Sequence, residues 1–482
     1  MNRYSEKVMR TWIGLGTRFL PFADAATPDL PLSRLLRLSL FQVSVGMELV
    51  LLIGTLNRVM IVELGVPAWL VGVMVSLPII FAPFRALIGF RSDVHTSQLG
   101  WKRVPFIWKG TLLQFGGLAI MPFALLVLSG DGNASQAPAW VGHIGAGMAF
   151  LLVGAGLHMT QTVGLALATD LAPPKSQPTV VGLMYTMLLV GMIVSALVFG
   201  AALADYTPQR LVEVIQGAGL ATMVLNVVAL WKQEPRRPRG AQLPPREPTF
   251  RESWDTFAQG EGAGRRLLAV GLGTMAFSME DILLEPYGGQ ILHLTVGETT
   301  KLTATLAIGG LLGFALASRV LSRGADPFRM AIAGSLVGVP AFLCVIGAAP
   351  LGAPFLFALG TLGIGFGAGL FGHGTLTATM NSAPADQRGL ALGAWGAVQA
   401  TAAGVAVALS GVIHDLVTKA VASRGALSAV SSSAVGYTTV YAIEVLLLVV
   451  TIVAMAPLVR RPSESARAKA AFVPPELETK TT

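Results

Sequence analysis

Charge is scarce in this sequence. Asp, Glu, Lys and Arg together make up 12% of its 482 residues, against roughly 25% in soluble globular domains. So low a charged fraction excludes an ordinary soluble enzyme or binding domain. Cysteine is scarcer still, because Cys344 is the only one. It cannot form an intrachain disulfide, and its apolar surroundings, "AFLCVIGA", predict a packing role rather than a reactive thiol.

Common signatures of catalysis and export are missing as well. The sequence contains no Walker loop, no CxxC pair and no HExxH zinc site, so nothing in it indicates ATP-driven, dithiol or zinc-protease chemistry. We therefore predict a protein that is not an enzyme. The first 30 residues lack the apolar core of a cleavable signal peptide.

Hydrophobic residues are what the sequence has in excess. They form 53% of the chain, and its mean hydropathy is +0.66. Apolar runs of about 18 or more residues recur, and each can cross a hydrocarbon core about 30 Å thick as a helix. The 55 glycines fit this class, since small residues let membrane helices approach closely. We predict an all-α polytopic membrane protein with twelve transmembrane helices, near residues 37–62, 68–90, 105–129, 140–169, 179–204, 210–231, 266–288, 300–322, 328–349, 353–380, 388–413 and 435–458.

The twelve predicted helices fall into two groups of six. The stretch between the groups, "KQEPRRPRGAQLPPREP", is rich in Pro and Arg and cannot span a membrane. The N-terminal segment mixes Arg with Trp, Leu and Phe, so it either lies along the membrane surface as an amphipathic helix or is a loosely ordered tail. The predicted parts are the N-terminal segment (1–36), two six-helix bundles (37–231 and 266–458), the linker between them (232–265) and a C-terminal tail (459–482).

An internal repeat supports two related halves. The stretch "ATDLAPPKSQPTVVGLM" (168–184) matches "TMNSAPADQRGLALGAW" (379–395), and the same offset pairs Gly200 with Gly411. Each copy lies at the fourth-to-fifth connection of its half, as in transporters built from parallel six-helix repeats. The repeat therefore predicts the major facilitator architecture.

Lys and Arg are unevenly distributed among the predicted loops. They crowd the N-terminus, the second-to-third loop, the linker, the loop after the eighth helix and the tail, whereas the opposite loops hold only Arg210, Lys301, Lys419 and Arg424. This bias predicts that both termini face the cytoplasm. The net charge of +8 reflects mostly the same bias, so we predict no nucleic-acid partner.

The second-to-third connection, "GFRSDVHTSQLGWKRVPF", has the ingredients of a facilitator loop signature. That signature places an acid near one helix end and basic residues beyond it. The stretch is either a latch between neighbouring helices on the cytoplasmic side or a solvated basic loop that only sets topology. Its candidate latch residues are Gly89, Arg91, Asp93, Gly100, Lys102 and Arg103.

Polar side chains within predicted helices are expensive in lipid and are therefore candidates for function. The alternative for each buried carboxylate is structural, namely a pair with an arginine across the bundle. Besides Glu48 in the first helix, the candidate intramembrane polar network consists of Asn57, Arg58, Arg85, Gln161, Asp170 and Glu444.

The stretch "MEDILLEPYGGQIL" (279–292) places three acids in the seventh predicted helix. At helical spacing Asp281 and Glu285 share one face, and Glu280 lies on another. We predict that Pro286 ends or kinks the helix and that the following Tyr-Gly-Gly unwinds it, facing a polar interior near the periplasmic side. Alternatively, the helix ends at Leu284 and Glu285 lies in a wet loop.

Histidines in matching helices raise the question of a pigment. A neutral imidazole can bind the magnesium of a chlorophyll-type macrocycle, and so can a carboxylate. A lone intramembrane histidine is otherwise a hydrogen-bonding core residue, and both interpretations stay open. The candidate pigment ligands are His158, His373, Glu48, Glu280, Asp281 and Glu285.

Long stretches of the chain resemble one family. The bacteriochlorophyll-delivery family (PucC/LhaA) of the major facilitator superfamily is similar to this sequence from about residue 30 to residue 458. The stretches that carry the resemblance are "TLNRVMIVELGVP", "FAPFRALIGFRSD", "GWKRVPFIWKGTLLQFGGLAIMPFALL", "HMTQTVGLALATDLAP", "EDILLEPYGGQIL" and "GLALGAWGAVQATAAG".

The resemblance implies a role in assembling the light-harvesting antennae of purple bacteria. It implies twelve helices in the bacterial inner, intracytoplasmic membrane, bacteriochlorophyll as the bound or transferred pigment, and antenna α and β polypeptides as partners beside membrane lipids. Contacts with the reaction centre and the pigment-synthesis machinery stay open. The stretch "RFLPFADAATPDLPLSRLLRLSLFQVSVGM" favours the LhaA-like branch, which serves the core antenna.

Two other functions compete with this one. A proton-coupled facilitator of a small or lipophilic solute would use Glu48 and the acids of 280–285 as proton carriers, with Arg58 as counter-charge. A structural scaffold would bind antenna proteins without pigment.

The predicted topology can be tested with reporter fusions. Fusions at Gln242 and Thr482 should both report a cytoplasmic location, because the Lys/Arg bias is consistent over nearly every loop. A periplasmic signal from either fusion would contradict the arrangement of six helices, linker and six helices.

Overall fold

The computed structural model confirms an all-helical chain. It describes residues 30–78, 88, 91–92, 97, 100–130, 138–173, 176–234, 263–382, 388–423 and 429–459, and within these ranges every regular element is a helix. Eleven helices in the described part are long and apolar enough to cross a membrane. They correspond to eleven of the twelve predicted helices. The other one, predicted near 68–90, is described mainly over its first half.

The first half of the chain begins with a composite helix. It starts at Leu32, five residues before the predicted start, and runs to Glu63 with two stretches of wider, π-helical winding. The elements of this half are α2 (Leu32–Leu38), α3 (Leu40–Leu49), η2 (Val50–Leu56), η3 (Val59–Glu63), α4 (Ala68–Ser76), α6 (Val104–Ser129), α7 (Ala139–Leu171), α8 (Gln177–Ala202) and α9 (Pro208–Leu230).

The second half repeats this plan and begins with a broken helix. Most of the predicted linker lies outside the described residues, as do the predicted N-terminal segment up to residue 29 and the tail from residue 460. The elements are α11 (Ala263–Ser278), η6 (Glu280–Ile282), α12 (Leu284–Gln290), α13 (Val296–Leu321), α14 (Pro327–Leu351), α15 (Pro354–Ser382), α16 (Arg388–Ala422), α17 (Ala429–Met455) and η7 (Ala456–Leu458).

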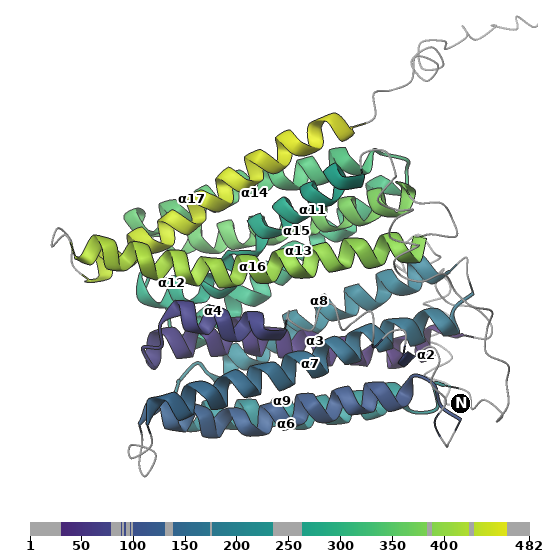
Figure 1. Cartoon of the computed structure of the whole chain (residues 1–482), viewed down its shortest axis with the longest axis horizontal. Coiled ribbons are helices and arrows are strands. Elements are labelled where there is room, and N and C mark those ends of the chain that lie inside the picture. The colour runs from purple at the N-terminus through teal and green to yellow at the C-terminus, as the bar shows by residue number, and fades with distance from the viewer. Residues whose placement is uncertain are drawn as a thin grey trace, which may run out of the picture.

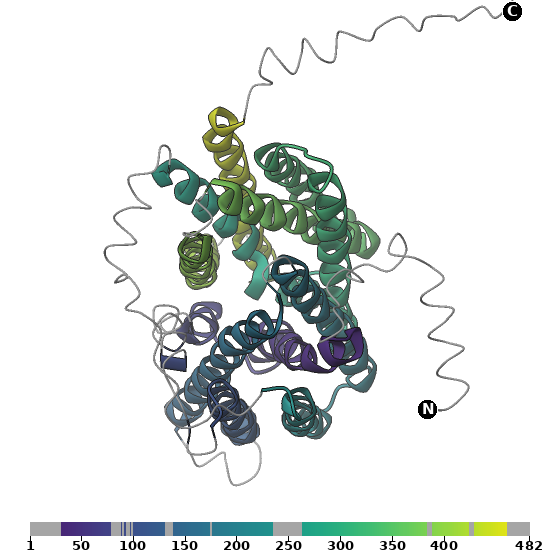
Figure 2. The same ribbon diagram turned by 90° about the vertical axis from the view of Figure 1, so that its right-hand side faces the viewer.

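The helices of the two halves form two groups that lie side by side (Figures 1 and 2). In Figure 1 the described chain both begins, at α2, and ends, after α17, on the right-hand side. We call this side the terminal end of the bundle. The opposite side, where α4 begins and where α12 lies, is called the far end. The sequence predicts that the terminal end is cytoplasmic.

The break in the seventh transmembrane helix corrects the sequence prediction. A 3₁₀ turn at Glu280–Ile282 interrupts the α-helix, and α12 then continues to Gln290. The predicted unwinding of the residues after Pro286 is therefore wrong, but the break lies in the turn before this residue, where a proline kinks a helix, as predicted for Pro286. Pro286 lies in the first turn of α12, where a missing backbone N–H costs little because that N–H has no partner within the helix. The alternative of a wet loop is also wrong, since Glu285 is 3% exposed.

Contacts between the halves gather toward the far end, and the predicted repeat appears there as matched glycines. Gly200 of α8 packs against α13, so that an added Cβ would lie 2.9 Å from the carbonyl oxygen of Gly297. Gly411 of α16 packs against α4 in the same way, with 2.5 Å from an added Cβ to the carbonyl oxygen of Ala68. The two glycines paired by the repeat therefore lie at equivalent contacts between the two halves.

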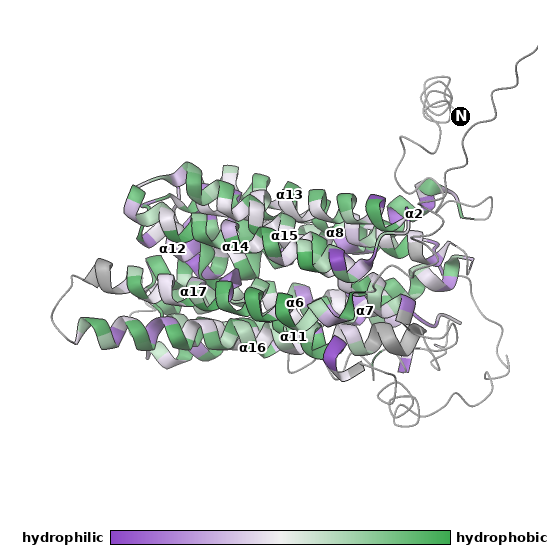
Figure 3. Ribbon diagram, turned by 90° about the horizontal axis from the view of Figure 1, so that it is seen from above, coloured by the Kyte–Doolittle hydropathy of each residue, from purple (hydrophilic) through white to green (hydrophobic). Residues whose placement is uncertain are grey.

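The outer surface of the bundle is apolar. Hydrophobic residues cover most of the length of the helices (Figure 3), and side chains such as Phe123 and Phe355 are 68% and 80% exposed. On a soluble protein so much exposed apolar surface would drive association. Here it matches the lipid that surrounds a multi-pass membrane protein.

The close contact at Gly411 yields a stability prediction. Gly411→Ala should destabilise the protein by about 1–3 kcal/mol, because the new methyl group overlaps the α4 backbone. Gly396→Ala on the same helix is the matched control, since an added Cβ there meets nothing within 4 Å. The control should be neutral or stabilising, because alanine favours the helix. Thermal unfolding in detergent would measure both, and equal midpoints would contradict close packing of the halves here.

Candidate functional site

Glu48 is the centre of a hydrogen-bonded network within the first half. Its side chain is completely buried, as expected from its place in an apolar helix. Gln114 Nε2 donates to Glu48 Oε2 at 2.8 Å, and Thr222 Oγ1 donates to Oε1 at 3.0 Å. Asn226 Nδ2 joins the network by donating to Thr111 Oγ1 at 3.0 Å. Both carboxylate oxygens therefore have donors, and none of these donors is an arginine.

These donors were not identified from the sequence. They lie on α6 and α9, far from Glu48 in the chain, so neither spacing nor periodicity connects them with it. The signal that could have found two of them is an amide residue within an apolar run: Gln114 in "TLLQFGG" and Asn226 in "MVLNVVAL".

Arg58 lies at the far end, where the first helix meets the second half. It is 3% exposed and forms an ion pair with Glu63, five residues along the same helix. Its Nη2 also donates to the carbonyl oxygen of Leu294 at 3.1 Å. The sequence predicted that a buried acid on another helix would pair with an arginine such as Arg58. The structure instead pairs Arg58 with Glu63 of its own helix. Nearby, Asn57 Nδ2 donates to the carbonyl oxygen of Asp281 at 3.3 Å.

The acids of the seventh helix and Glu444 of α17 form a second polar site, within the second half. Glu280, Glu285 and Glu444 are 2%, 3% and 0% exposed, and Asp281 is partly exposed. Thr303 donates a short hydrogen bond to Glu285. Glu444 lies close enough to Glu280 and Asp281 for their charges to interact. Glu285 faces the first half, because a Cβ added to Gly54 of η2 would lie 2.5 Å from Glu285 Oε1.

Hydrogen bonds do not satisfy this acidic site as they do the network around Glu48. Within the described residues, no hydrogen bond reaches Glu280 Oε2 or Glu285 Oε2. The carboxylate of Glu444 lies against the backbone N–H of Glu280. The hydroxyl of Tyr441 is also buried and unpartnered there. The described residues contain no group of three or more His, Cys, Asp or Glu side chains arranged to hold a metal ion.

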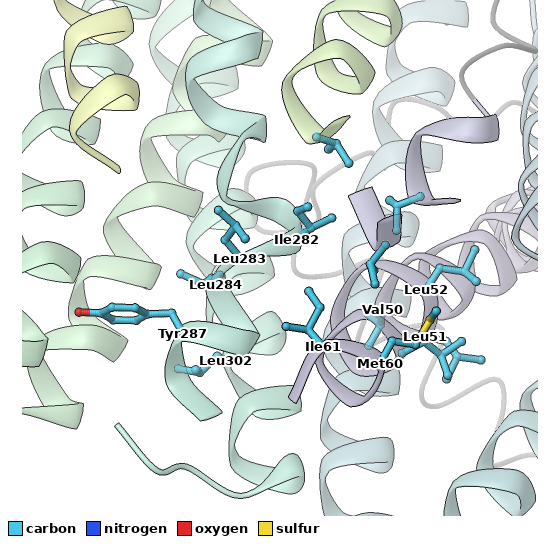
Figure 4. Packing of buried hydrophobic residues seen from close by; sticks show 14 of the residues in the cluster. Val50, Leu51, Leu52, Met60, Ile61, Ile282, Leu283, Leu284, Tyr287 and Leu302 are labelled. Carbon is cyan, nitrogen blue, oxygen red and sulfur yellow. The ribbon is translucent and has the colours of Figure 1, made fainter. Parts of the chain in front are cut away.

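Large side chains pack tightly around the acids. Figure 4 shows Ile282 on the side of the first half, which Ile61 approaches from the first helix, whereas Leu284 and Tyr287 lie on the side of the second half. The Tyr287 ring lies 5.3 Å from that of Tyr437 between centroids, and its hydroxyl donates to the carbonyl oxygen of Val345 at 3.0 Å. The acids are therefore enclosed by protein and not by an open cleft.

The two candidate histidines lie in corresponding helices but not at equivalent positions, because the repeat offset of 211 pairs His158 with Gly369, four residues before His373. His158 and His373 each lie nineteen residues after the first residue of their helices, α7 and α15. Both side chains are partly exposed, and the Nδ1 atom of each is buried. The His373 ring packs edge-on against Phe314 of α13, with 4.3 Å between ring centroids. Gln161 is partly exposed one turn after His158.

A histidine that sequence analysis did not single out lies between the halves at the far end. His414 of α16 is 5% exposed, and its Nδ1 lies 2.9 Å from Asp415 Oδ1. The backbone N–H of Trp69, at the start of α4, donates to Asp415 Oδ2 at 2.9 Å. The adjacent pair "HD" within an apolar helix is the signal that could have found it.

The predicted latch is present in part, with partners other than those expected. Arg103 Nε donates to Asp170 Oδ2 at 3.0 Å, and Lys102 Nζ lies 3.7 Å from the same oxygen. Glu234 accepts hydrogen bonds from the backbone N–H groups of Lys102, Arg103 and Val104, the last at 2.9 Å. These contacts tie α6 to the ends of α7 and α9 at the terminal end.

Asp170 therefore belongs to this latch and not to the intramembrane network. It lies in the last turn of α7, and its side chain is 39% exposed. Arg91 and Gly100 lie within the described residues, but no contact of either is part of the latch. Arg85, Gly89 and Asp93 lie outside the described residues.

Comparisons with known proteins agree with this architecture and identify proteins of similar sequence. A family model described as "PUCC protein" matches residues 55–463. The chain is 63% identical to Protein PucC of Rhodovulum sulfidophilum over 86% of this chain and 92% of that protein. It is 59% identical to Protein PucC of Rhodobacter capsulatus over 92% of this chain and 96% of that protein.

Among solved structures, the chain resembles transporters of the major facilitator fold. A bacterial homologue of the human lysosomal transporter Spinster, in an inward-facing and occupied conformation, gives a TM-score of 0.67. The match covers 90% of this chain and 97% of that one at 15% identity. The likeness confirms the predicted fold, and at this identity it shows nothing further.

The network around Glu48 yields a prediction about stability. Thr222→Val keeps the shape of the side chain but removes a donor to a buried carboxylate, which should cost about 1–3 kcal/mol. Thr305→Val is the matched control, because Thr305 is partly exposed and its hydroxyl bonds only to Lys301 of its own helix. Chemical or thermal unfolding of the two variants would measure the difference. Equal stability would show that Glu48 does not depend on this donor.

Proposed function

The chain belongs to the PUCC protein family, and on that premise we propose that it is a non-enzymatic membrane assembly factor for bacterial light-harvesting antennae. Its relatives show it to be a photosynthesis-related, multi-pass membrane protein. Our proposal adds that it binds bacteriochlorophyll, or delivers it, to nascent antenna α and β polypeptides. We favour the core antenna on the N-terminal sequence alone, and the names of the two relatives described above lend that preference no support.

The placement of His158 and His373 is the observation that carries the pigment proposal. When bound, the pigment would supply a magnesium ion that one protein side chain can ligate. A single imidazole is therefore enough, and no cluster of ligands is needed. Either ring nitrogen of a neutral imidazole can act as such a ligand. The chain thus offers one such ligand in each half.

The carboxylates fit the pigment less well than the histidines. Glu48, Glu280 and Glu285 are at most 3% exposed, so a flat macrocycle far larger than a side chain cannot approach them without repacking the bundle. We therefore assign the ligand role to His158 and His373. Antenna helices would dock on the apolar outer surface, where small residues allow close approach.

Pigment that co-purifies with the protein tests the ligand assignment. The double variant His158→Leu/His373→Leu should lose bacteriochlorophyll absorbance, because leucine fills much the same volume but cannot bind magnesium. Its thermal unfolding should stay close to that of the parent. His143→Leu, on the same helix as His158 but near its start, is the matched control and should retain the pigment.

Two outcomes would contradict this assignment. Full retention of pigment by the double variant would exclude imidazole as the ligand. A parent protein that purifies without pigment from a pigment-producing cell, yet captures antenna polypeptides, would support a structural scaffold.

A further inference from the structure

The acidic site of the second half lacks the compensation that buried charges require. Glu280 Oε2 and Glu285 Oε2 are buried and receive no hydrogen bond from the described residues, and Glu444 is completely buried beside Glu280 with no cation among these residues as its partner. Burying an ionised carboxylate without a partner costs several kcal/mol even after the protein relaxes. The acids must therefore either bind a cation or be neutral.

Tyr441 is a second buried polar group at this site that lacks a hydrogen-bond partner. Its side chain is completely buried, its hydroxyl has no partner among the described residues, and it lies near Glu444 and Glu280. A phenol can donate as well as accept a hydrogen bond. It can therefore pair with either form of a neighbouring carboxyl group.

The geometry argues against a bound cation. No arrangement of three or more ligating side chains in the described chain could hold a metal ion. Arg58 lies near Glu285 but already pairs with Glu63 and with the carbonyl oxygen of Leu294. Lys301, on α13, packs its stem against Gly200 of α8. Protons are the remaining occupant.

We propose that Glu280, Asp281, Glu285 and Glu444 form a proton-binding site, and that its protonation holds the two halves together at the far end. Each proton comes from a hydronium ion of the solvent, which becomes water, and it converts one carboxylate to a neutral carboxyl group. The inference is independent of pigment binding.

The link to the first half rests on direct contacts. Asn57 donates to the backbone of Asp281, and a Cβ added to Gly54 of η2 would lie 2.5 Å from Glu285 Oε1. Arg58 lies against Gly289 of α12, with 3.0 Å from an added Cβ to Nη2. A charge formed on Asp281 or Glu285 needs water around it, and water can enter only if these contacts separate. Ionisation therefore opposes closure of the halves.

Water has an approach to this region from the far end. Glu63 is 35% exposed and lines a pocket of about 290 Å³ together with Leu64, Leu128, Ser129, Tyr206 and Pro208. The pocket brings solvent to the Arg58–Glu63 pair, and Arg58 adjoins Glu285. This is the side from which protons would exchange.

Other titratable groups lie close enough to need controls. Arg58 and Glu63 face the site from the first helix, and His414 and Asp415 approach through Tyr437, whose ring lies 4.3 Å from that of His414. Tyr287 and Tyr441 are the remaining titratable groups beside the acids. His414 is therefore replaced in the labelled protein, so that the response of the acids is measured without it.

Infrared spectroscopy tests whether the acids hold protons. At neutral pH the purified protein should show the C=O stretch of protonated carboxylic acids, and Glu280→Gln and Glu444→Gln should each reduce its amplitude. Glu213→Gln is the matched control, because Glu213 is exposed on α9 and should contribute nothing to this band. A band that is unchanged in both buried variants would show ionised acids and overturn the proposal.

A pair of spin labels tests the link to closure. Cysteines in place of Trp69 and Leu416 report on the far end, since these residues are 41% and 63% exposed and the backbone of Trp69 binds Asp415. Cys344→Ala removes the native thiol, and His414→Gln removes the nearby histidine. Dipolar broadening between the labels should be lost as pH rises.

A neutral variant of the site supplies the decisive comparison. With Glu280, Glu285 and Glu444 replaced by Gln and Asp281 by Asn, the broadening should persist at every pH, because amides imitate the protonated acids. Two results would overturn the proposal: a pH response equal to that of the parent, or no response in the parent itself.

Discussion

A bilayer interior offers no water, so every polar group within it must find a partner in the protein or become neutral. This constraint shapes the whole bundle. It places the charged latch of Lys102, Arg103 and Asp170 at the terminal end. It also makes the few polar side chains within the helices the most informative residues of the chain. The helices themselves are held by close contact of apolar and glycine-rich surfaces.

The two halves meet this constraint in different ways despite their common plan. In the first half, amide and hydroxyl groups from neighbouring helices satisfy Glu48. In the second half, Glu280 and Glu285 are buried beside other acids, and each has one oxygen without a donor. The repeat preserved the fold and the glycine contacts but not the polar interior. A self-contained network suits a rigid support, whereas an unsatisfied one suits a part that responds to its surroundings.

The sequence predicted the elements far better than the contacts. Helix number and the division into halves depend on the length of apolar runs, which is visible locally. The donors of Glu48 lie on other helices, so no local pattern could connect them. The unwinding predicted for the residues after Pro286 was wrong, because a proline disturbs the helical turn before it and can itself lie in the first turn of a helix. Whether Asp170 lies within the membrane or in the latch at the terminal end depends on where α7 ends, and helix ends are the least certain feature of a sequence prediction.

The π-helical winding of the first transmembrane helix has a consequence for how this protein can evolve. Residues 50–56 and 59–63 depart from regular α-helical winding just before and after Arg58. Adding or removing one residue in an α-helix turns everything beyond it by about 100°. Such a change within 50–56 would turn Arg58 away from Leu294 of the second half. The length of this stretch should therefore be inherited more faithfully than the identity of its apolar side chains.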